Sequence, residues 1–317
     1  MSGAAQTTLA AQASAKTAPA NTPPASGSRR TSAPKPHHRP VTRRGIVARS
    51  VLYAVLVAIA LVYIFPFLVE IATSFKTDAE AAVNPVSLVP ANWSTAAIQQ
   101  LFLSSDFPLW FKNSAIVTIF VTVGRVFFDS LAGYALARLH FRGRSVIFAG
   151  LIAVMSVPTV VLLIPKFLVI NQLGMYDSYA GMIIPLLVDA AGVFIMKNFF
   201  ESIPASVEEQ AHIDGAGTFR VFWSIVLPMA RPALVTIIIL SFQGSWNELS
   251  QFIISTQDPA LTTLTKGVAS LASGQLSQGT QYPLKLAAAI IMTIPVAVMF
   301  FIFQKRIMNT SEGAVKE

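Results

Sequence analysis

Residues 202–228 read SIPASVEEQAHIDGAGTFRVFWSIVLP and form a polar stretch between two long apolar segments. Ser206, followed three residues later by Glu209, is typical of a capping box, so we expect a helix to begin at Ser206. The sequence Gly-Ala-Gly at 215–217 should end this helix, and Thr218 is placed to cap a second one.

The second helix of this stretch should carry an apolar stripe until Pro228 stops it. The stripe consists of residues at helical spacing, namely Phe219, Phe222, Trp223 and Val226. On the first helix, Val207, Ala211 and Gly215 share one narrow face at i, i+4 and i+8. Together the two helices predict a compact helical unit just outside a membrane, with a shape suited to docking another protein.

The composition is that of an integral membrane protein. Of the 317 residues, 54% are hydrophobic and only 12% are charged, whereas soluble domains carry about a quarter charged residues. There is no cysteine, which excludes disulfides and thiol chemistry. The net charge of +8 would fit a nucleic-acid partner, but eight of the 23 Lys and Arg residues lie within the first 49 positions and no acidic residue precedes Glu70. This distribution indicates the positive-inside bias of a membrane protein, so no nucleic-acid partner is expected.

Six apolar segments, each about as long as a bilayer requires, define the predicted spans. They cover residues 50–72, 113–137, 145–165, 179–200, 233–255 and 284–303. With the N-terminus inside, the predicted cytoplasmic segments hold seventeen Lys and Arg residues and the outer segments hold five. Both termini should therefore be cytoplasmic, and the stretch at 202–228 should face the cytoplasm.

Three regions of the chain follow from these patterns. Residues 1–48 are rich in Ala, Ser, Thr and Pro with a basic end, and they predict a disordered cytoplasmic tail that contacts anionic lipid. Residues 49–303 form the six-span domain, and residues 304–317 form a C-terminal cytoplasmic tail. The expected fold class is an all-α integral membrane protein with a cytoplasmic helix-turn-helix loop.

The stretch at 202–228 resembles the coupling loop of permease subunits of binding-protein-dependent ABC importers. The family signature is Glu-Ala-Ala, three residues, Gly, nine residues and Ile-x-Leu-Pro. This chain has Glu209-Gln210-Ala211, then Gly215, then Ile225-Val226-Leu227-Pro228. Gln210 is the one departure from the signature, and the spacing holds. An ordinary amphipathic loop and a DNA-reading helix-turn-helix are the alternatives, and membrane spans on both sides disfavour the latter.

Shorter motifs extend the resemblance over residues 50–317 to the sugar-permease branch, and to the maltose-type subunit with six spans. They are Ser74-Phe75-Lys76, Ala132-Gly133-Tyr134-Ala135-Leu136-Ala137-Arg138, Trp246-Asn247-Glu248 and Gly313-Ala314-Val315-Lys316. The resemblance implies import of an oligosaccharide or glycoside by alternating access in a bacterial plasma membrane. It also implies a second homologous permease, two ATPase subunits that bind ATP and Mg²⁺, and an extracytoplasmic sugar-binding protein.

The resemblance further implies that the first helix of the loop sits in a groove of the ATPase. The coupling residues would be Glu209, Ala211, Asp214, Gly215, Ile225, Leu227 and Pro228. Small side chains at Ala211 and Gly215 would let another surface approach the backbone. Gly215 is also explained by a plain helix C-cap, and His212 is expected to be a solvated face residue.

Polar residues within spans are the candidates for the transport path, because they are costly in lipid. The candidates are Gln243, Asn247, Glu248, Arg125, Asp129 and Asp189. Asn247 and Glu248 would bind sugar hydroxyls, with packing as the alternative. Arg125 and Asp129 lie at i and i+4, so we expect them to pair within one span, and Asp189 to share Arg125. The partner permease could hold the substrate instead.

The sequence carries no motif for catalysis or nucleotide binding. It lacks the P-loop pattern, H-E-x-x-H and G-x-S-x-G, and its four histidines are not clustered as metal ligands. We therefore expect a protein that is not an enzyme and holds no cofactor or metal. An ion-coupled secondary transporter would use carboxylates such as Asp129 and Asp189, but it leaves the coupling motif unexplained. A membrane-embedded enzyme would need a nucleophile or metal cluster.

Overall fold

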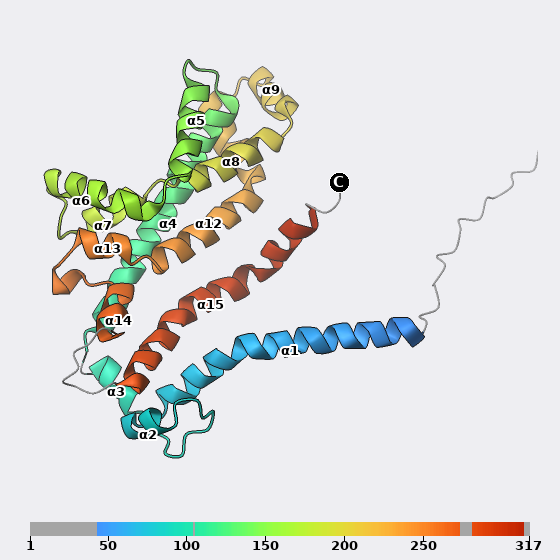
Figure 1. Ribbon diagram of the computed structural model, residues 1–317. Helices are drawn as coiled ribbons and strands as arrows, with labels where there is room; N and C mark the ends of the chain where they lie inside the picture. Colours follow the sequence, from blue (N-terminus) through green and yellow to red (C-terminus); the bar gives the residue numbers. More distant parts are fainter. Residues whose placement is uncertain (1–42, 104, 273–280, 314–317) are drawn as a thin grey trace, which may run out of the picture. The chain divides into compact units, whose positions relative to one another are not determined.

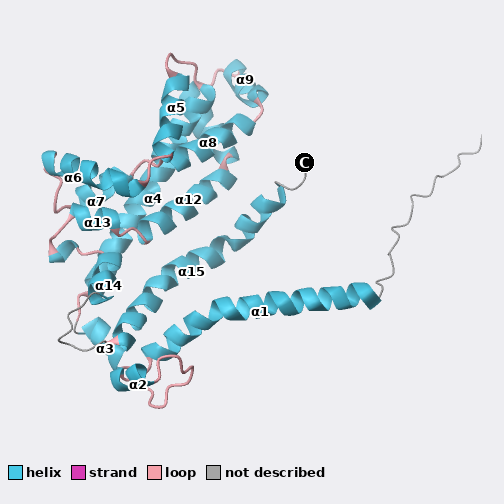
Figure 2. Cartoon of the chain, viewed as in Figure 1, coloured by secondary structure: helices cyan, strands magenta, loops and turns pink. Residues whose placement is uncertain are grey.

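The computed structural model describes residues 43–103, 105–272 and 281–313, and these residues form helices and loops without a strand (Figures 1 and 2). The predicted tail lies outside the described residues up to position 42, as do residues 314–317. By internal contacts the chain divides into two units, 1–56 and 57–317. The described part of the first unit is the beginning of α1, and the second unit contains all the other described elements.

The described elements follow one another closely along the chain. The long helices are α1 (Arg43–Ser74), α4 (Phe107–Arg138), α8 (Ala190–Ser202), α12 (Arg231–Trp246) and α15 (Tyr282–Gly313). The medium helices are α3 (Ala96–Leu103), α5 (Arg144–Met155), α6 (Leu163–Gln172), α9 (Ala205–Ile213) and α14 (Leu264–Ala272). The short helices are α2 (Asp78–Val83), α7 (Tyr179–Ile183), α10 (Thr218–Val221), α11 (Leu227–Met229) and α13 (Ser250–Ser255). Four tighter or wider turns complete the list: 3₁₀ turns at Thr159–Leu162, Ile184–Leu186 and Pro259–Leu261, and a π turn at Phe222–Val226.

The all-helical membrane fold predicted from the sequence is confirmed. Among the described residues, four helical segments are long and apolar enough to cross a membrane, and two bent helix pairs raise the number to six if each pair is one span. The first helix begins at Arg43 and α15 ends at Gly313. The parts of these helices that are apolar enough to span a membrane are Arg49–Ser74 and Tyr282–Gln304, close to the predicted spans 50–72 and 284–303. Residues 43–48, which were expected to belong to the disordered tail, are helical.

The third predicted span, 145–165, is broken. The helix α5 ends at Met155, and the next helical segment, Thr159–Gln172, is bent from it by 104°. Pro158 lies in the break with φ −58° and ψ 131°. Its ring removes one backbone donor and pushes the preceding residue out of the helical region, which explains why the apolar run does not stay helical.

The fifth predicted span, 233–255, is also interrupted. The helix α12 ends at Trp246, and α13 begins only at Ser250. The Glu248 carboxylate accepts a hydrogen bond from the Gln251 N–H at 2.9 Å, and the Thr265 hydroxyl donates to the Glu248 carbonyl at 2.6 Å. These contacts satisfy backbone groups that an uninterrupted helix would have paired internally, so they stabilise the break.

The helix α4 lies at the centre of the second unit. It packs against α8 and α12, and α14 covers its beginning (Figure 1). One apolar cluster joins the end of α4 to α8, the π turn and α12, through Tyr134, Met196, Phe200, Phe222, Val226 and Ile237. Two further clusters lie around Trp110 and Trp246 and around Val121 and Phe252. This arrangement makes α4 the element to which the candidate site is attached.

Candidate functional site

The helix α9 begins without the capping box that the sequence predicted. Pro204 occupies the N-cap position with an extended backbone, no side chain caps the helix, and the first helical residue is Ala205. Ser206 and Glu209 are exposed. Because the fixed φ of proline already fits the residue before a helix, the chain can start the helix one residue earlier than expected. Thr218 likewise lies inside α10, whose N-cap is Gly217.

The end of α9 is a turn that requires a left-handed residue. Gly215 has φ +81°, its N–H donates to the His212 carbonyl at 3.0 Å, and the Ala216 N–H donates to the Ala211 carbonyl at 2.9 Å. This pair of bonds is the Schellman motif, in which glycine avoids the strain that a Cβ would cause. The His212 ring nitrogen Nδ1 lies 2.8 Å from the Ala216 carbonyl. The predicted role of Gly215 in ending the helix is therefore confirmed.

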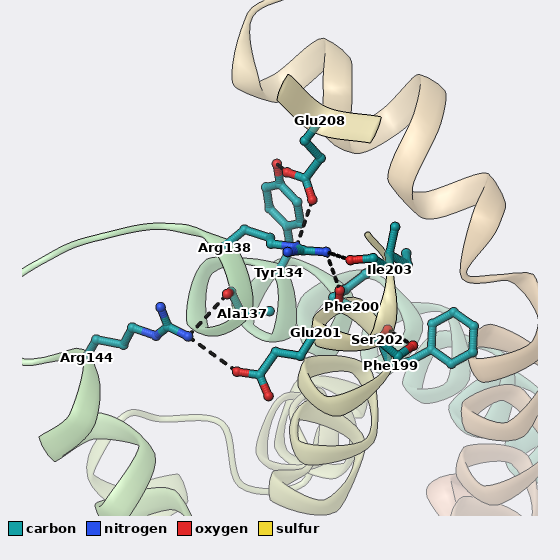
Figure 3. Close-up of polar contacts among 10 residues, drawn as sticks. All are labelled: Tyr134, Ala137, Arg138, Arg144, Phe199, Phe200, Glu201, Ser202, Ile203 and Glu208. Atoms are coloured by element: carbon teal, nitrogen blue, oxygen red, sulfur yellow. Dashed lines mark hydrogen bonds and ion pairs between the residues drawn. The ribbon is translucent and has the colours of Figure 1, made fainter. Parts of the chain in front are cut away.

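A buried carboxylate fixes α9 to the membrane helices, and it belongs to Glu208 rather than to Glu209 (Figure 3). Glu208 is 8% exposed. Its Oε1 lies 2.8 Å from the Arg138 Nε, and its Oε2 accepts a hydrogen bond from the Tyr134 hydroxyl at 3.0 Å. Tyr134 and Arg138 stand one turn apart near the end of α4, so a single helix face holds both carboxylate oxygens.

Arg138 also binds the chain just before α9. Its Nη2 donates to the Phe200 carbonyl at 2.7 Å and to the Ile203 carbonyl. Phe200 lies in the last turn of α8 and Ile203 follows its end, a region in which helix carbonyls lack a full set of helical partners. The Phe200 carbonyl also accepts from the Ile203 N–H at 3.2 Å. One guanidinium thus joins the end of α4 to the end of α8 and the start of α9 (Figure 3).

A second ionic group supports the same corner. The Glu201 carboxylate lies 2.7 Å from the Lys197 Nζ and 3.4 Å from the Arg144 Nη2, and Arg144 also donates to the Ala137 carbonyl at 3.1 Å. Lys197 stands over the Phe148 ring at 4.3 Å from its centre. These contacts connect α5 and α8 to α4. The start of α9 is therefore attached to a region in which three helices are held together by ionic contacts.

The residues of α9 and its turn that the sequence singled out divide into buried and exposed ones. Ala211 is 7% exposed and belongs to the apolar cluster around Phe200 and Phe222, so its side chain packs within the chain, and its contact with an ATPase stays a prediction. Glu209, Asp214 and Gly215 are exposed, and a Cβ at Gly215 would meet no atom within 4 Å. The exposed residues of this stretch therefore lie around the turn that follows α9.

Two large, exposed apolar side chains lie on either side of the turn that follows α9. Ile213 is 84% exposed and Phe219 is 70% exposed. Phe219 and the partly exposed Trp223 were predicted to lie on an apolar stripe, of which only Phe222 and Val226 are buried. Exposed apolar residues gathered around a polar turn are a feature of protein contact surfaces.

Pro228 does not stop the second helix. The chain passes through a π turn at Phe222–Val226 and continues helically through α11, where Pro228 takes an early position, before it bends by 79° into α12. The wider turn ahead of Pro228 gives room to the carbonyl that the proline ring would otherwise strike. Ile225 and Leu227 pack against the cluster of α4 and α8, so both serve the packing within the chain.

The candidate path residues lie in two separate groups. Gln243 and Asn247 are exposed at the end of α12, and the Asn247 amide donates to the Gln243 carbonyl at 3.0 Å. Glu248 follows them in the break before α13. The second group contains Arg125, Asp129 and Asp189, and its contacts differ from the expected ion pair.

Arg125 and Asp129 do not form the predicted ion pair. The ion pairs among the described residues join Arg138, Arg144 and Lys197 to Glu208 and Glu201. Instead, the Arg125 Nε donates to the Leu186 carbonyl at 2.7 Å, and the Asp129 Oδ1 accepts from the Asp189 N–H at 3.0 Å. Both side chains turn toward the backbone of the neighbouring span because its free groups compete successfully for them.

A cavity of about 370 Å³ lies between α4, the π turn and α12. Its lining is almost entirely apolar and includes Val126, Phe127, Trp223 and Leu234. Such a lining offers few partners for the hydroxyl groups of a sugar. No group of three or more potential metal ligands occurs in the described ranges.

Comparisons with known proteins place this architecture in one family. Residues 129–309 match the family model of the binding-protein-dependent transport system inner membrane component. The chain belongs to this family. It is thus a permease subunit of the ABC importer class, as the coupling motif predicted. The family implies an ATPase and a substrate-binding protein as partners and an inner-membrane location.

Several characterised permeases are similar to this one over most of their length. A sulfoquinovosyl glycerol transport system permease of Agrobacterium fabrum is 34% identical over 78% of this chain and 86% of its own. An arabinooligosaccharides transport system permease of Bacillus subtilis is 31% identical over 85% of this chain and 96% of its own. A diacetylchitobiose uptake system permease of Streptomyces coelicolor is 30% identical over 84% of this chain and 89% of its own.

A solved structure shares the fold of this permease. It is a crystal structure of a bacterial ABC transporter involved in the import of the acidic polysaccharide alginate, with a TM-score of 0.74 and 24% identity over 83% of this chain and 98% of the other.

Proposed function

We propose that this permease carries a carbohydrate, of the oligosaccharide or glycoside class, across the bacterial plasma membrane. Sugars and sugar conjugates are named for several relatives that align over most of this chain, among them sulfoquinovosyl glycerol, arabinooligosaccharides and diacetylchitobiose. The exposed amide groups of Gln243 and Asn247, beside Glu248, provide the kind of hydrogen-bonding partners that sugar hydroxyls require. These three residues are our proposed path residues in α12 and the break that follows it.

The proposed complex contains a second homologous permease, two ATPase subunits and an extracytoplasmic binding protein. The ATPase subunits bind ATP and Mg²⁺ and carry out hydrolysis, while this chain supplies the membrane path and a surface that receives force. Both termini lie in the cytoplasm, in accordance with the distribution of Lys and Arg. ATP-driven closure of the ATPases pushes α9, and the spans alternate between inward-open and outward-open states.

The single observation that carries the coupling proposal is the attachment of α9. The turn that follows α9 is exposed, and Ile213 and Phe219 on either side of it are exposed too. The buried Glu208 attaches α9 to Arg138 and Tyr134 of α4. A segment that transmits force from an ATPase to the membrane helices must be accessible to the ATPase on one side and rigidly attached to those helices on the other. Glu209, Asp214 and Gly215 lie on the open side, and we propose them as contacts of the ATPase.

Affinity purification of the tagged chain from its native cell in mild detergent, followed by mass spectrometry, tests this assembly. We expect an ATPase and a second permease to co-purify, and the complex in proteoliposomes to take up a sugar only when ATP and the binding protein are present. Uptake by the chain alone, driven by an ion gradient, would contradict the proposal. So would recovery of the chain alone under conditions in which a known ABC complex survives.

A further inference from the structure

The fourth span is interrupted near its middle. The first half, α7 with its 3₁₀ turn, ends at Leu186, and α8 begins at Ala190 after a non-helical segment that includes Asp189. A break of this kind leaves carbonyl and N–H groups without partners inside the chain's own helix. Within a bilayer no water is available to satisfy them, so another part of the protein must do so.

Two polar side chains of α4 satisfy the two sides of this break. The Arg125 Nε donates to the Leu186 carbonyl at 2.7 Å, on the side where the first half ends. The Asp129 Oδ1 accepts from the Asp189 N–H at 3.0 Å, on the side where α8 begins. Arg125 and Asp129 are one helical turn apart, so one face of α4 contacts both sides of the break.

The fit around Asp129 is close. Asp129 is 0% exposed, and its second oxygen, Oδ2, has no hydrogen-bond partner. That oxygen lies over Gly192, where a Cβ would stand only 2.1 Å from it. The Asp189 side chain accepts from the Gly192 N–H at 3.2 Å, so two carboxyl groups lie at the N-terminus of α8.

The other end of α8 is attached to α4 as well. Arg138 binds the Phe200 and Ile203 carbonyls there. Between the two ends, a Cβ at Gly133 would lie 2.6 Å from the Met196 Cβ, so the backbones approach each other closely. The helix α8 is therefore held to α4 at its beginning, along its length and at its end.

We propose that Arg125 and Asp129 are positioning residues that clamp the break of the fourth span onto α4, so that the break, α8 and α4 move as one body when α9 is displaced. Asp129 acts through its acceptor oxygen, and Arg125 acts through its Nε donor. The inference rests on the proposed transport function. It takes both residues, with Asp189, out of the group of substrate contacts.

A disulfide across the clamp tests whether α4 and the break stay together. The chain has no cysteine, so an introduced pair is the only one present. A Cβ at Gly124 would lie 3.7 Å from the Leu187 Cβ, within the range of about 3.5–4.5 Å found in disulfides. We expect Gly124→Cys with Leu187→Cys to cross-link on oxidation in the assembled complex and to keep ATP-dependent uptake.

Substitutions of Asp129 separate its acceptor role from its charge. Asp129→Asn keeps an acceptor oxygen and should retain uptake. Asp129→Ala removes the acceptor and should lower uptake about tenfold, the upper end of the effect of losing one hydrogen bond. Basal ATPase activity and co-purification of the ATPase should persist in Asp129→Ala. Oxidation of the cysteine pair in the Asp129→Ala background should restore uptake, because the disulfide replaces the clamp.

Leu187→Cys alone controls for oxidation, and Glu70→Gln controls for loss of an ionisable group from a span. If Asp129→Ala fails to assemble, Arg125→Met and Arg125→Lys provide the same comparison, with Lys keeping a donor. The proposal is overturned if the cross-linked parent loses uptake that reduction restores, if the disulfide does not rescue Asp129→Ala, or if Asp129→Asn is as defective as Asp129→Ala. Absence of ATP-dependent uptake by the unmodified complex would instead refute the proposed function.

Discussion

At the scale of single residues, two neighbouring glutamates have different roles. The motif drew attention to Glu209, which is exposed, whereas Glu208 is the residue that fixes α9 to Arg138 and Tyr134. The sequence held a signal for Glu208, because Tyr134 and Arg138 lie at i and i+4 at the end of an apolar helix and need an acidic partner. The location of Glu208, four residues after Pro204, gave no indication that Glu208 would be the acidic partner of Arg138 and Tyr134.

Glu208→Ala should loosen α9. It leaves the Arg138 guanidinium without its carboxylate, which we expect to cost about 3 kcal/mol, the lower end of the range for breaking a buried pair, because both side chains keep some exposure. Limited proteolysis in the 203–217 segment should become faster, and ATPase co-purification should fall. Glu209→Ala is the matched control and should leave the proteolysis rate unchanged. Equal rates in the two variants would contradict the anchoring role of Glu208.

Gly192→Ala should disturb the break of the fourth span. The added Cβ would lie 2.1 Å from the Asp129 Oδ2, so the carboxyl must move away from the Asp189 N–H. We expect a loss of stability on the order of 1–3 kcal/mol, as for other overpacked sites. Gly150→Ala is the control, since its Cβ meets nothing within 4 Å, and alanine should stabilise that helix by about 0.5–1 kcal/mol. Thermal unfolding in detergent measures both, and equal melting temperatures would contradict the prediction.

At the scale of helices, the apolar runs predicted where spans occur but not where they break. Pro158 lies at the break of the third span, yet Pro66 and Pro295 lie inside continuous helices. The presence of proline alone therefore does not determine where a span breaks. The breaks of the fourth and fifth spans are stabilised by groups distant in sequence, such as Arg125 on Leu186 and Thr265 on Glu248. Such contacts depend on which helices become neighbours, and periodicity carries no information about that.

Gly215, in the turn after α9, has two possible roles, as a contact of the ATPase and as the helix C-cap. Substitutions can test these roles separately. Gly215→Asn should keep the turn, because asparagine tolerates positive φ, while it adds a side chain to an open surface. Gly215→Leu should strain the turn in addition. If the ATPase contacts this surface closely, both variants should bind it more weakly, and only Gly215→Leu should lower the melting temperature. Normal ATPase binding by Gly215→Asn would leave Gly215 with the C-cap role alone.

One connection between loops should depend on pH. Asp177 accepts hydrogen bonds from the Gln257 N–H at 2.5 Å, the Asp258 N–H at 3.0 Å and the Thr256 hydroxyl at 2.9 Å. These bonds, the one from Gln257 above all, lower the pKa of Asp177 below its ordinary value. Because the folded pKa is depressed, the stabilisation is present above the unfolded pKa of about 4 and is lost as the pH falls through the folded pKa.

We therefore expect hydrogen exchange at the Gln257 and Asp258 amides, corrected for its intrinsic pH dependence, to accelerate as the pH falls below about 4. Asp177→Asn should exchange faster than the parent at neutral pH and show no such acceleration. An unchanged exchange rate in the parent across this range would argue against the contribution of the charged carboxylate.

At the scale of the whole molecule, α4 connects the parts on which the function depends. Its beginning packs under α14, its middle holds the break of the fourth span, and its end holds the base of α9. The fold class and the family were predictable from apolar segments and from one motif with fixed spacing. The attachment points on α4 were not, because they join residues about sixty to seventy positions apart.

The proposed contact of the ATPase with the turn at the end of α9 can be tested by cysteine labelling. Ile213 is 84% exposed at this turn, and Val89 is 71% exposed in the loop that precedes α3. A single cysteine at either position is unique in a chain without cysteine. We would measure maleimide labelling of Ile213→Cys and Val89→Cys in the purified complex and again after the ATPase has been stripped away. We expect the ATPase to protect position 213 from labelling and to leave position 89 unaffected. Equal labelling of position 213 with and without the ATPase would contradict the proposed contact.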